Sequence, residues 1–398
     1  MEYDIVIIGG GQAGLSFACS MMETNIKILL VEKRPLELLC DPKPDGREIA
    51  LTHLSVDILK KMGAWQTIPE DVISPLKEAR IFDGNTSSSL NFSSDNSSNS
   101  ELGYLIPNYK LCKSLYKQLQ SASNVEILTD VMVEDVIRQD VFSSVTLSTG
   151  KQINTKLVIA ADSRFSTIRR KMGIPALIKD FSKVMVVSQM KLEKPHHHIA
   201  LECFHYGRTV ALLPMVGNHA SIVMTVTADK ADEIAKQSEH EFNSQITQLF
   251  KGEFGKMELE GEHFAYPLVG VYSQSLVSHR FALIGDAAVG MHPVTAHGSN
   301  LGLRGQDILA DTLKEALRVG SDIGAINVLK RYENKQIHIT RILYFGTNSI
   351  VALFTNDAPI AKQIRKVALK VASHFPPIKH VITRHLTNTN RMSKLLPF

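Results

Sequence analysis

A short apolar run near the start of the chain ends in three regularly spaced glycines, and this pattern constrains the fold more than any other feature. Ile5 to Ile8 are β-branched without interruption, which is typical of a strand buried on both faces of a parallel sheet. Gly9, Gly11 and Gly14 follow with G-x-G-x-x-G spacing. The first glycine permits a tight turn, the second lets the backbone approach a pyrophosphate, and the third lets a helix pack on the strand. The segment therefore predicts a dinucleotide-binding strand–turn–helix unit.

The residues that follow complete this unit. Residues 12–22 are expected to form a helix whose N-terminal amides face the phosphates. A second apolar run, Ile26 to Val31, ends in Glu32, 18 residues beyond Gly14. An acidic residue at that place accepts hydrogen bonds from a ribose and disfavours a 2′-phosphate, so the tightly bound nucleotide is not expected to be NADP.

A second segment, almost a chain length downstream, repeats this logic. Phe281 to Ile284 is expected to form a strand, and Gly285-Asp286 places an acid at its end, where it can bind a polyol hydroxyl. Residues 291–302 are expected to form a loop leading to a helix at 303–317, whose N-terminal amides would face an electron-rich group such as a reduced flavin. By itself this segment also fits an ordinary strand–turn–helix with an Asx turn. Together the two segments indicate a flavin enzyme.

The order of the expected elements predicts an α/β fold with a Rossmann-like FAD-binding domain, an inserted β-sheet substrate domain and a C-terminal helical segment. The FAD-binding domain takes residues 1–75, 103–180 and 268–330, the substrate domain residues 76–102 and 181–267, and the C-terminal segment residues 331–398. Residues 85–100, rich in serine and asparagine, are expected to form a loop or hairpin tip. One helix is expected from about Ala231 to Phe250.

Size and composition fit a soluble or peripheral enzyme. A chain of 398 residues suggests two domains, and 44% apolar residues is ordinary for a globular protein. The four cysteines are scattered without metal-ligand spacing, and His196-His197-His198 has no accompanying ligand cluster, so reduced thiols in the cytoplasm and no metal are expected. No signal peptide is expected, and no stretch approaches the roughly 20 apolar residues of a membrane span.

Positive charge is concentrated at the C-terminal end. The net charge is +4, but eight Lys or Arg residues and no acidic residue follow Asp357, so residues 1–357 carry −4. Apolar residues recur at helical spacing from Ile360 to Val371. The pattern fits either a helical layer packed on the body or a basic amphipathic surface for anionic lipids on the inner face of the cytoplasmic membrane. A nucleic-acid partner is not expected, because no recognition motif accompanies the charges.

These segments resemble the single-component flavoprotein aromatic hydroxylases, and most of all the ubiquinone-biosynthesis hydroxylases of the UbiH/UbiF/VisC group, over essentially the whole chain. The family's three flavin motifs match at Gly9–Gly14 with Glu32, at Ala161-Asp162 with Arg169, and at Gly285-Asp286 through Gly302. Further similarities are the D-G-R-x-I-A-L segment at 45–51, Tyr266-Pro267-Leu268 and Tyr332-Glu333.

Some positions depart from the majority of that group. Ser163 stands where glycine is usual, Ala296-His297-Gly298 where Gly-Gln-Gly is typical, and Asn108 where arginine or glutamine is common. The strings at 103–108, 161–166 and 290–298 are similar to those of the UbiM branch, which is associated with hydroxylation of ubiquinone precursors, including 5-demethoxyubiquinol.

The resemblance implies one bound FAD, NAD(P)H as a transient reductant, O2, and an aromatic substrate that is a prenylated phenol. It implies FAD contacts from Gly9, Gly11, Gln12, Ala13, Gly14, Glu32, Lys33, Arg47, Asn108, Val133, Asp162, Asp286, Pro293, Gly298, Ser299, Asn300 and Leu301.

The implied mechanism belongs to the cofactor. A flavin C4a-hydroperoxide would form beside the Pro293 loop and attack an electron-rich phenol carbon, with no side chain acting as nucleophile or metal ligand. His205, Tyr206 and Tyr266 are candidates to approach the phenol, but a packing role is favoured for each of them. Two other functions remain open: a related FAD-dependent hydroxylase or reductase of a soluble phenol or isoprenoid, and a non-catalytic flavoprotein of a biosynthetic complex.

Overall fold

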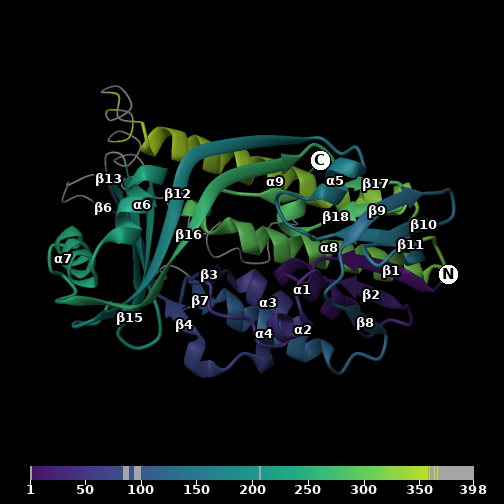
Figure 1. Ribbon diagram of the computed structural model, residues 1–398, viewed down its shortest axis with the longest axis horizontal. Helices are drawn as coiled ribbons and strands as arrows, with labels where there is room; N and C mark the ends of the chain where they lie inside the picture. The colour runs from purple at the N-terminus through teal and green to yellow at the C-terminus, as the bar shows by residue number, and fades with distance from the viewer. Residues whose placement is uncertain are drawn as a thin grey trace.

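The structure is a computed structural model that describes residues 2–83, 89–93, 100–205 and 208–356, together with Ala358, Gln363 and Arg365. Its described strands form three sheets, with helices between and around them, and the predicted α/β class is confirmed. Two long strands, β12 and β16, run from the end of the molecule that carries helices α6 and α7 toward the sheet that contains β1 (Figure 1).

The first sheet contains the predicted nucleotide-binding unit. Its strands are ordered β17-β18-β11-β1-β2-β8, and β10 joins β9 to β11. Strand β1 pairs in parallel with β2 and β11. Because Ile5, Val6 and Ile7 are fully buried, their branched side chains stabilise the centre of the sheet. The strands are β1 Tyr3–Ile8, β2 Ile28–Val31, β8 Val125–Leu128, β9 Val133–Arg138, β10 Ser143–Leu147, β11 Gln152–Ala160, β17 Val277–Ser278 and β18 Phe281–Leu283.

Helices lie around this first sheet, and a small third sheet is ordered β3-β7-β4. The elements are β3 Glu48–Leu51, β4 Ser74–Leu76, β7 Gly103–Pro107, α1 Gln12–Met21, α2 Leu36–Cys40, α3 His53–Lys61, α4 Asn108–Leu119, α5 Thr167–Lys171 and α8 His297–Arg318. Helix α8 begins six residues earlier than predicted. Ala296 has a left-handed backbone, φ 52°, which ends the 3-10 turn Pro293–Thr295 and lets α8 start at once.

The second sheet is ordered β19-β16-β12-β15-β14-β13-β5-β6. Helices α6 and α7 pack on one of its faces (Figure 1). The elements are β5 Glu78–Asp83, β6 Ser89–Ser93, β12 Ala176–Leu192, β13 Ile199–His205, β14 Arg208–Pro214, β15 His219–Val226, β16 Met257–Ser273, β19 Val289–Gly290, α6 Ala228–Lys236 and α7 Glu239–Leu249. Strand β6 places part of the serine-rich stretch in a hairpin with β5. The domain boundaries predicted at 181 and 268 fall inside β12 and β16, so the division into domains stays a prediction.

The single helix predicted from Ala231 to Phe250 is wrong, because the structure has α6 and α7 there. Ser238 separates them. Its hydroxyl accepts a hydrogen bond from the Glu241 amide while the Glu241 carboxylate accepts from the Ser238 amide, which forms a capping box. This reciprocal pair stabilises a new helix start at the point where a continuous helix was expected.

Helix α9, Ile326–Phe354, contradicts the expectation that no stretch is apolar enough to span a membrane. By length and composition alone it could cross one, and only 22% of its most apolar window is buried. One face is anchored: Tyr332 Oη donates to the Leu283 carbonyl at 2.8 Å, and Glu333 accepts from the Leu276 amide at 2.7 Å. Of the predicted basic tail, residues 357, 359–362, 364 and 366–398 lie outside the described residues.

Candidate active site

The three glycines after β1 have distinct local roles. Gly9 has φ 107°, and a Cβ there would lie 2.6 Å from the Ala161 carbonyl oxygen of the neighbouring strand. A Cβ on Gly14 would lie only 1.9 Å from the Gly9 carbonyl oxygen, so helix α1 can pack on β1 only with glycine at this position. A Cβ on Gly11 would meet nothing within 4 Å. Packing therefore requires Gly9 and Gly14, whereas Gly11 leaves open space at the N-terminus of α1.

The two distant sequence segments meet at this point. Gly285 has φ 59°, and a Cβ there would lie 2.5 Å from Cβ of Ala13 in the first turn of α1. A Cβ added to Gly302 of α8 would lie 3.6 Å from the Gly285 Cα. Helices α1 and α8 both start without a side-chain cap or an acidic residue in the first turn. Uncapped N-termini leave amides that can bind anionic groups, here beside the turn after β18.

Glu32, the predicted ribose-binding residue, is buried at the end of β2. Its carboxylate accepts from the Gly10 amide at 2.5 Å and from Arg34 Nε at 2.9 Å. Burial raises the pKa of Glu32, but the bonds from Arg34 and Gly10 outweigh it, and the net pKa lies below its usual value. Lys33 is exposed. The segment before Val133 contacts this strand end, because the Val131 amide donates to the Glu32 carbonyl. The sequence pattern did not reveal Arg34.

Two acidic residues from different segments flank the turn after β11. Asp162 Oδ1 is buried and has no hydrogen-bond partner in the part of the chain that the structure describes, and burial raises the pKa of this carboxyl. Asp286 is paired with Arg164, with Nη2 and Oδ2 2.7 Å apart. Arg169 is buried and donates to the Ala287 carbonyl at 3.0 Å, so it positions the backbone next to Asp286. The Arg164 pairing was not predicted, because it depends on how separate segments meet.

Arg47 directly precedes β3 of the third sheet and lies beside Tyr266 of the second sheet. It is paired with Asp45, with Nη2 and Oδ2 2.6 Å apart, and its guanidinium carbon lies 5.7 Å from the centre of the Tyr266 ring. Asn108 Nδ2 donates to the same Asp45 carboxylate at 2.8 Å, and Tyr266 Oη donates to the Asp45 carbonyl at 2.7 Å. The structure thus brings together Arg47, Asn108 and Tyr266. The Tyr266 hydroxyl already binds backbone, which supports a packing role. The His205 side chain and all of Tyr206 lie outside the described residues.

The Pro293 loop is held from both ends. The preceding His292 is 6% exposed, its Nδ1 accepts from the Val294 amide, and its ring lies 4.8 Å from that of Phe181. Burial, with a smaller effect of Lys179, lowers the pKa of His292 to about 4, so its ring is neutral at neutral pH. Thr295 Oγ1 lies 3.0 Å from Thr347 Oγ1 of α9, which ties the loop to that helix.

The first turn of α8 contains four of the predicted contacts. Asn300 is buried, and its side chain bonds to the Ala50 carbonyl and the Thr52 amide, so it joins α8 to β3. Leu301 is also buried, whereas Gly298 and Ser299 are partly exposed, and a Cβ on Gly298 would meet nothing within 4 Å.

The crevice formed by these segments fits FAD. Gln12 Nε2 and Asp162 Oδ1 are buried polar atoms without a partner among the described residues, and such atoms require an explanation. Both belong to residues predicted to contact the cofactor. Gly11 leaves space for a pyrophosphate at an uncapped helix start, and Asp286 and Glu32 provide carboxylates at the ends of two strands of one sheet.

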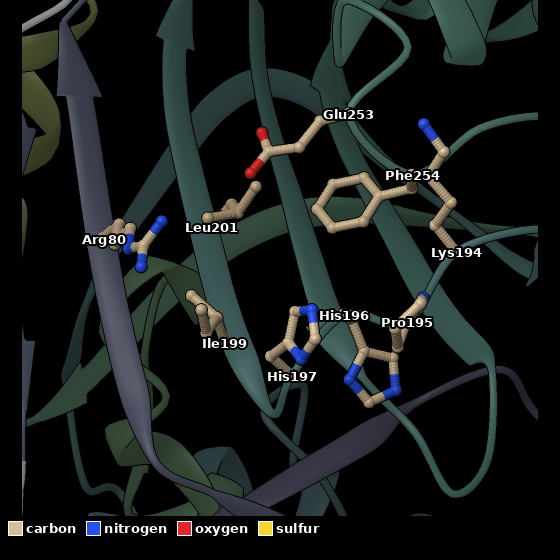
Figure 2. Close-up of a pocket in the computed structure, with 9 residues that line it drawn as sticks. All are labelled: Arg80, Lys194, Pro195, His196, His197, Ile199, Leu201, Glu253 and Phe254. Carbon is tan, nitrogen blue, oxygen red and sulfur yellow. The ribbon is translucent and has the colours of Figure 1, made fainter.

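A separate cavity of about 280 Å³ lies on the side of β13 that faces away from this crevice. Figure 2 shows its lining, which includes Arg80, Lys194, His196 and Glu253 around Leu201. The His196 ring is buried and its Nε2 is 2.9 Å from the Met215 carbonyl oxygen, so it serves packing. None of the residues predicted to bind the cofactor lines this cavity.

Comparison with known proteins decides the family. Residues 2–340 match the FAD binding domain family. The chain is 44% identical over 391 residues to ubiquinone hydroxylase UbiM of Neisseria meningitidis, covering 97% of this chain and 85% of the relative. It belongs to the FAD-dependent ubiquinone hydroxylase family. This family membership confirms the resemblance found in the sequence, and the chain is an FAD-dependent monooxygenase.

Further relatives and one similar solved structure are consistent with this family. It is 29% identical to ubiquinone hydroxylase UbiL of Rhodospirillum rubrum over 98% of this chain and 90% of the relative. It is 26% identical to 3-demethoxyubiquinol 3-hydroxylase of Escherichia coli over 94% of this chain and 96% of the relative. The crystal structure of p-nitrophenol 4-monooxygenase PnpA from Pseudomonas putida superimposes with a TM-score of 0.79 at 17% identity, covering 98% of this chain and 100% of the other. At that identity the superposition shows the fold alone.

Proposed function

We propose that this monooxygenase hydroxylates the aromatic ring of a prenylated phenol that is a precursor of ubiquinone, with O2 and NAD(P)H as co-substrates. The observation that carries the proposal is the 44% identity to ubiquinone hydroxylase UbiM across 97% of the chain. The crevice supports it, because its glycine turns and carboxylates come from all three segments that resemble the family's flavin motifs.

The chain's own residues bind and orient. Bound FAD supplies the redox chemistry, which is hydride acceptance from NAD(P)H and activation of oxygen. The N-termini of α1 and α8 would hold its phosphates and ring system, and Glu32 and Asp286 its hydroxyl groups. The Asp45–Arg47–Tyr266 cluster and the His292–Phe181 ring contact beside the Pro293 loop join the FAD-binding part to the second sheet. That sheet would cover the reacting ring and exclude water.

Quinone-profile rescue tests this function. The chain would be expressed in bacterial strains that each lack one ring hydroxylase of ubiquinone biosynthesis, and their quinones would be separated by mass. Restored ubiquinone in one strain would identify the ring position. Gly11→Val, which should lose FAD without losing the fold, is the matched control. Absence of rescue in every strain, with soluble yellow protein present, would contradict the proposed substrate.

We also propose a peripheral position on the inner face of the cytoplasmic membrane. A prenylated substrate partitions into the bilayer, so the enzyme needs a surface that reaches it. Residues Ile342 to Thr355 of α9 contain no charged side chain, and Ile342, Phe345 and Ile350 are exposed by 63%, 43% and 43%. The chain then continues into the segment with eight positive charges and no acid. An apolar stripe beside positive charge suits anionic lipid headgroups.

One basic residue of the tail, Arg365, is not part of this proposed lipid surface. Arg365 is 1% exposed, and its Nη1 donates to the carbonyls of Leu353, Phe354 and Asn356. It therefore caps the C-terminal end of α9, where carbonyls lack helical partners. The neighbouring Lys362, Lys366 and Lys370 lie outside the described residues.

A further inference from the structure

Strand β13 presents one face to helices α6 and α7 and the other to the FAD-binding part. Leu201 belongs to the apolar core beneath those helices. Side chains alternate along a strand, so Glu202, the neighbour of Leu201, points to the opposite face. Phe204, two residues further along, points to the same face as Glu202. The Phe204 ring lies 4.5 Å from that of Phe354 of α9, which confirms that this second face is the one turned toward α9.

Glu202 lies in an apolar row across this inner face. Its cross-strand neighbours are Ile81 on β5 and Ala211 on β14. The row continues through Val223 and Val187 to Phe264 of β16. Phe264 lies against Gly46, where an added Cβ would be 2.5 Å from its ring. A single carboxyl group therefore stands in a line of apolar side chains that ends at the Asp45–Arg47 loop.

The Glu202 side chain has no hydrogen bond or ion pair with any of the described residues. Loss of hydration alone raises the pKa of its carboxyl to about 8, although the residue remains partly exposed. Around Glu202, this face of β14, β15 and β12 carries no ionisable group: its residues there are Thr209, Ala211, Leu213, Ser221, Val223, Thr225, Met185, Val187 and Gln189. Farther along the same face lie His219, Lys191, Glu258 and Glu260, with His219 Nε2 3.2 Å from Glu260 Oε2. Tyr266 of β16 and the Asp45–Arg47 pair lie beyond Phe264, while the Asp83 side chain on β5 lies outside the described residues. An unpaired carboxyl in apolar surroundings is costly and marks a candidate functional group.

Helix α9 relates this carboxyl to the Pro293 loop. Thr347 contacts Thr295 of the loop, and Phe354 contacts Phe204. These two contacts are seven residues apart on one helix face, which corresponds to roughly 10 Å along the axis. Glu202 is two residues from Phe204, or about 7 Å along β13. The Pro293 loop and the inner face of β13 thus contact the same face of α9, about two helical turns apart.

Resting on the proposed function, we propose that Glu202 binds the phenolic hydroxyl of the substrate and accepts its proton during hydroxylation. The O–H bond of the phenol breaks, the proton forms a bond to a Glu202 carboxylate oxygen, and the electron pair stays on the phenol oxygen. The electron density that enters the ring makes the carbon ortho or para to that oxygen more nucleophilic. After the ring carbon has gained oxygen and lost its hydrogen, Glu202 returns the proton. The electrons for the reaction come from NAD(P)H and the oxygen atom from O2.

Glu202→Gln tests this role with purified FAD-loaded enzyme and a short-chain prenylated phenol. The amide keeps the size and a hydrogen bond but cannot accept the proton. We expect unchanged FAD content, continued NAD(P)H oxidation with hydrogen peroxide release, and roughly 100-fold slower hydroxylated product formation. Glu253→Gln, in the cavity of Figure 2 on the other face, is the matched control and should behave as wild type.

The pH profile separates proton transfer from a structural role. The wild-type product rate should rise between pH 6.5 and 8.5, because the fraction of ionised Glu202 grows from about one tenth at pH 7 to about half at pH 8. The profile of Glu202→Gln should be flat over that range. If Glu202→Gln does not fold, Glu202→Asp should keep the rise with pH at a reduced rate.

Failure of this proposal is distinguishable from failure of the proposed function. A Glu202→Gln enzyme with wild-type product rate and pH profile would overturn the role of Glu202 and leave the function standing. A wild-type enzyme that forms no product from any prenylated phenol would overturn the proposed function, and the role of Glu202 with it.

Discussion

The guanidinium of Arg164 lies against the carboxylate of Asp286, with Nη2 and Oδ2 2.7 Å apart and Nε and Oδ2 3.2 Å apart. The pair joins the turn after β11 to the turn after β18. Arg164 also donates to the Val269 carbonyl of β16 at 3.1 Å. The position of the Asp286 carboxylate therefore depends on both sheets.

Asp286→Ala should weaken FAD binding without loss of the fold, because it removes a hydrogen-bond acceptor and creates no clash. The expected loss is about 1–3 kcal/mol, or roughly 5- to 150-fold in Kd. Fluorescence titration of the apoprotein with FAD measures it. Asp311→Ala is the control, because it removes only an exposed ion pair between Asp311 of α8 and Lys61 of α3. Unchanged FAD affinity in Asp286→Ala would remove this residue from the site.

Gly11→Val and Gly14→Ala should fail in different ways. At Gly11 a side chain meets open space, so the variant should fold with a wild-type circular dichroism spectrum and lack FAD, because the pyrophosphate is blocked. At Gly14 even a methyl group would lie 1.9 Å from the Gly9 carbonyl oxygen, so this variant should be insoluble or unfolded. Full FAD occupancy in folded Gly11→Val protein would contradict the nucleotide assignment.

Two non-glycine residues with positive φ should be replaceable by glycine with a gain in stability. Ser163 has φ 133° and Ala296 has φ 52°, at positions where the aromatic hydroxylases resembled by this chain commonly have glycine. Relief of backbone strain should exceed the entropy cost of glycine and raise the free energy of unfolding by about 1 kcal/mol for each. Urea denaturation of the apoprotein measures this. Ala310→Gly, inside α8, should lower it instead.

His292 should make the protein less stable in mild acid. Its pKa is lowered to about 4 in the fold, so between the ordinary value near 6.5 and pH 4 the unfolded chain takes up a proton that the folded chain does not. Stability is therefore lost as the pH falls through this window, by about 3 kcal/mol from this residue. His292→Asn retains an acceptor for the Val294 amide and should show a smaller loss between pH 7 and pH 5. An equal loss in both proteins would show that another group is responsible.

The exposed stripe of α9 should bind lipid. Replacement of Ile342, Phe345 and Ile350 by serine should lower co-sedimentation with anionic liposomes. Each replacement removes apolar surface that would enter the membrane–water interface. Binding by wild type should also fall with salt, as screening weakens the attraction of the basic tail. Ile137→Ser with Val141→Ser, which are 54% and 64% exposed near the edge of the first sheet, is the matched control.

Equal binding of wild type to anionic and neutral liposomes would contradict the charge contribution. Equal binding of the serine variant and wild type would contradict the α9 surface. Arg365→Gln is expected to destabilise the end of α9 rather than to change lipid binding directly, because Arg365 is buried against helix carbonyls.

Local patterns predicted much of this fold. The β-branched run before Gly9 and the apolar run before Gly285 form β1 and β18 of one sheet, on either side of β11. The predicted helix at 12–22 is α1, and the predicted strand at 281–284 is β18. Such elements follow from hydrophobic runs and turn residues that are close in sequence. Helix boundaries were less predictable: the break at Ser238 and the early start of α8 depend on single capping and backbone conformations.

The sequence by itself determined that a nucleotide crevice forms, because the glycine spacing and the acid after each strand act through steric limits within a few residues of one another. Only the tertiary structure decided which side chains share that crevice. Arg164 reaches Asp286 across 122 residues, Tyr266 reaches Asp45 across 221, and Glu202 faces inward because of the register of β13 between β5 and β14. Cross-strand register and the folding of distant segments onto one another arise from packing of the whole core, which no local spacing records.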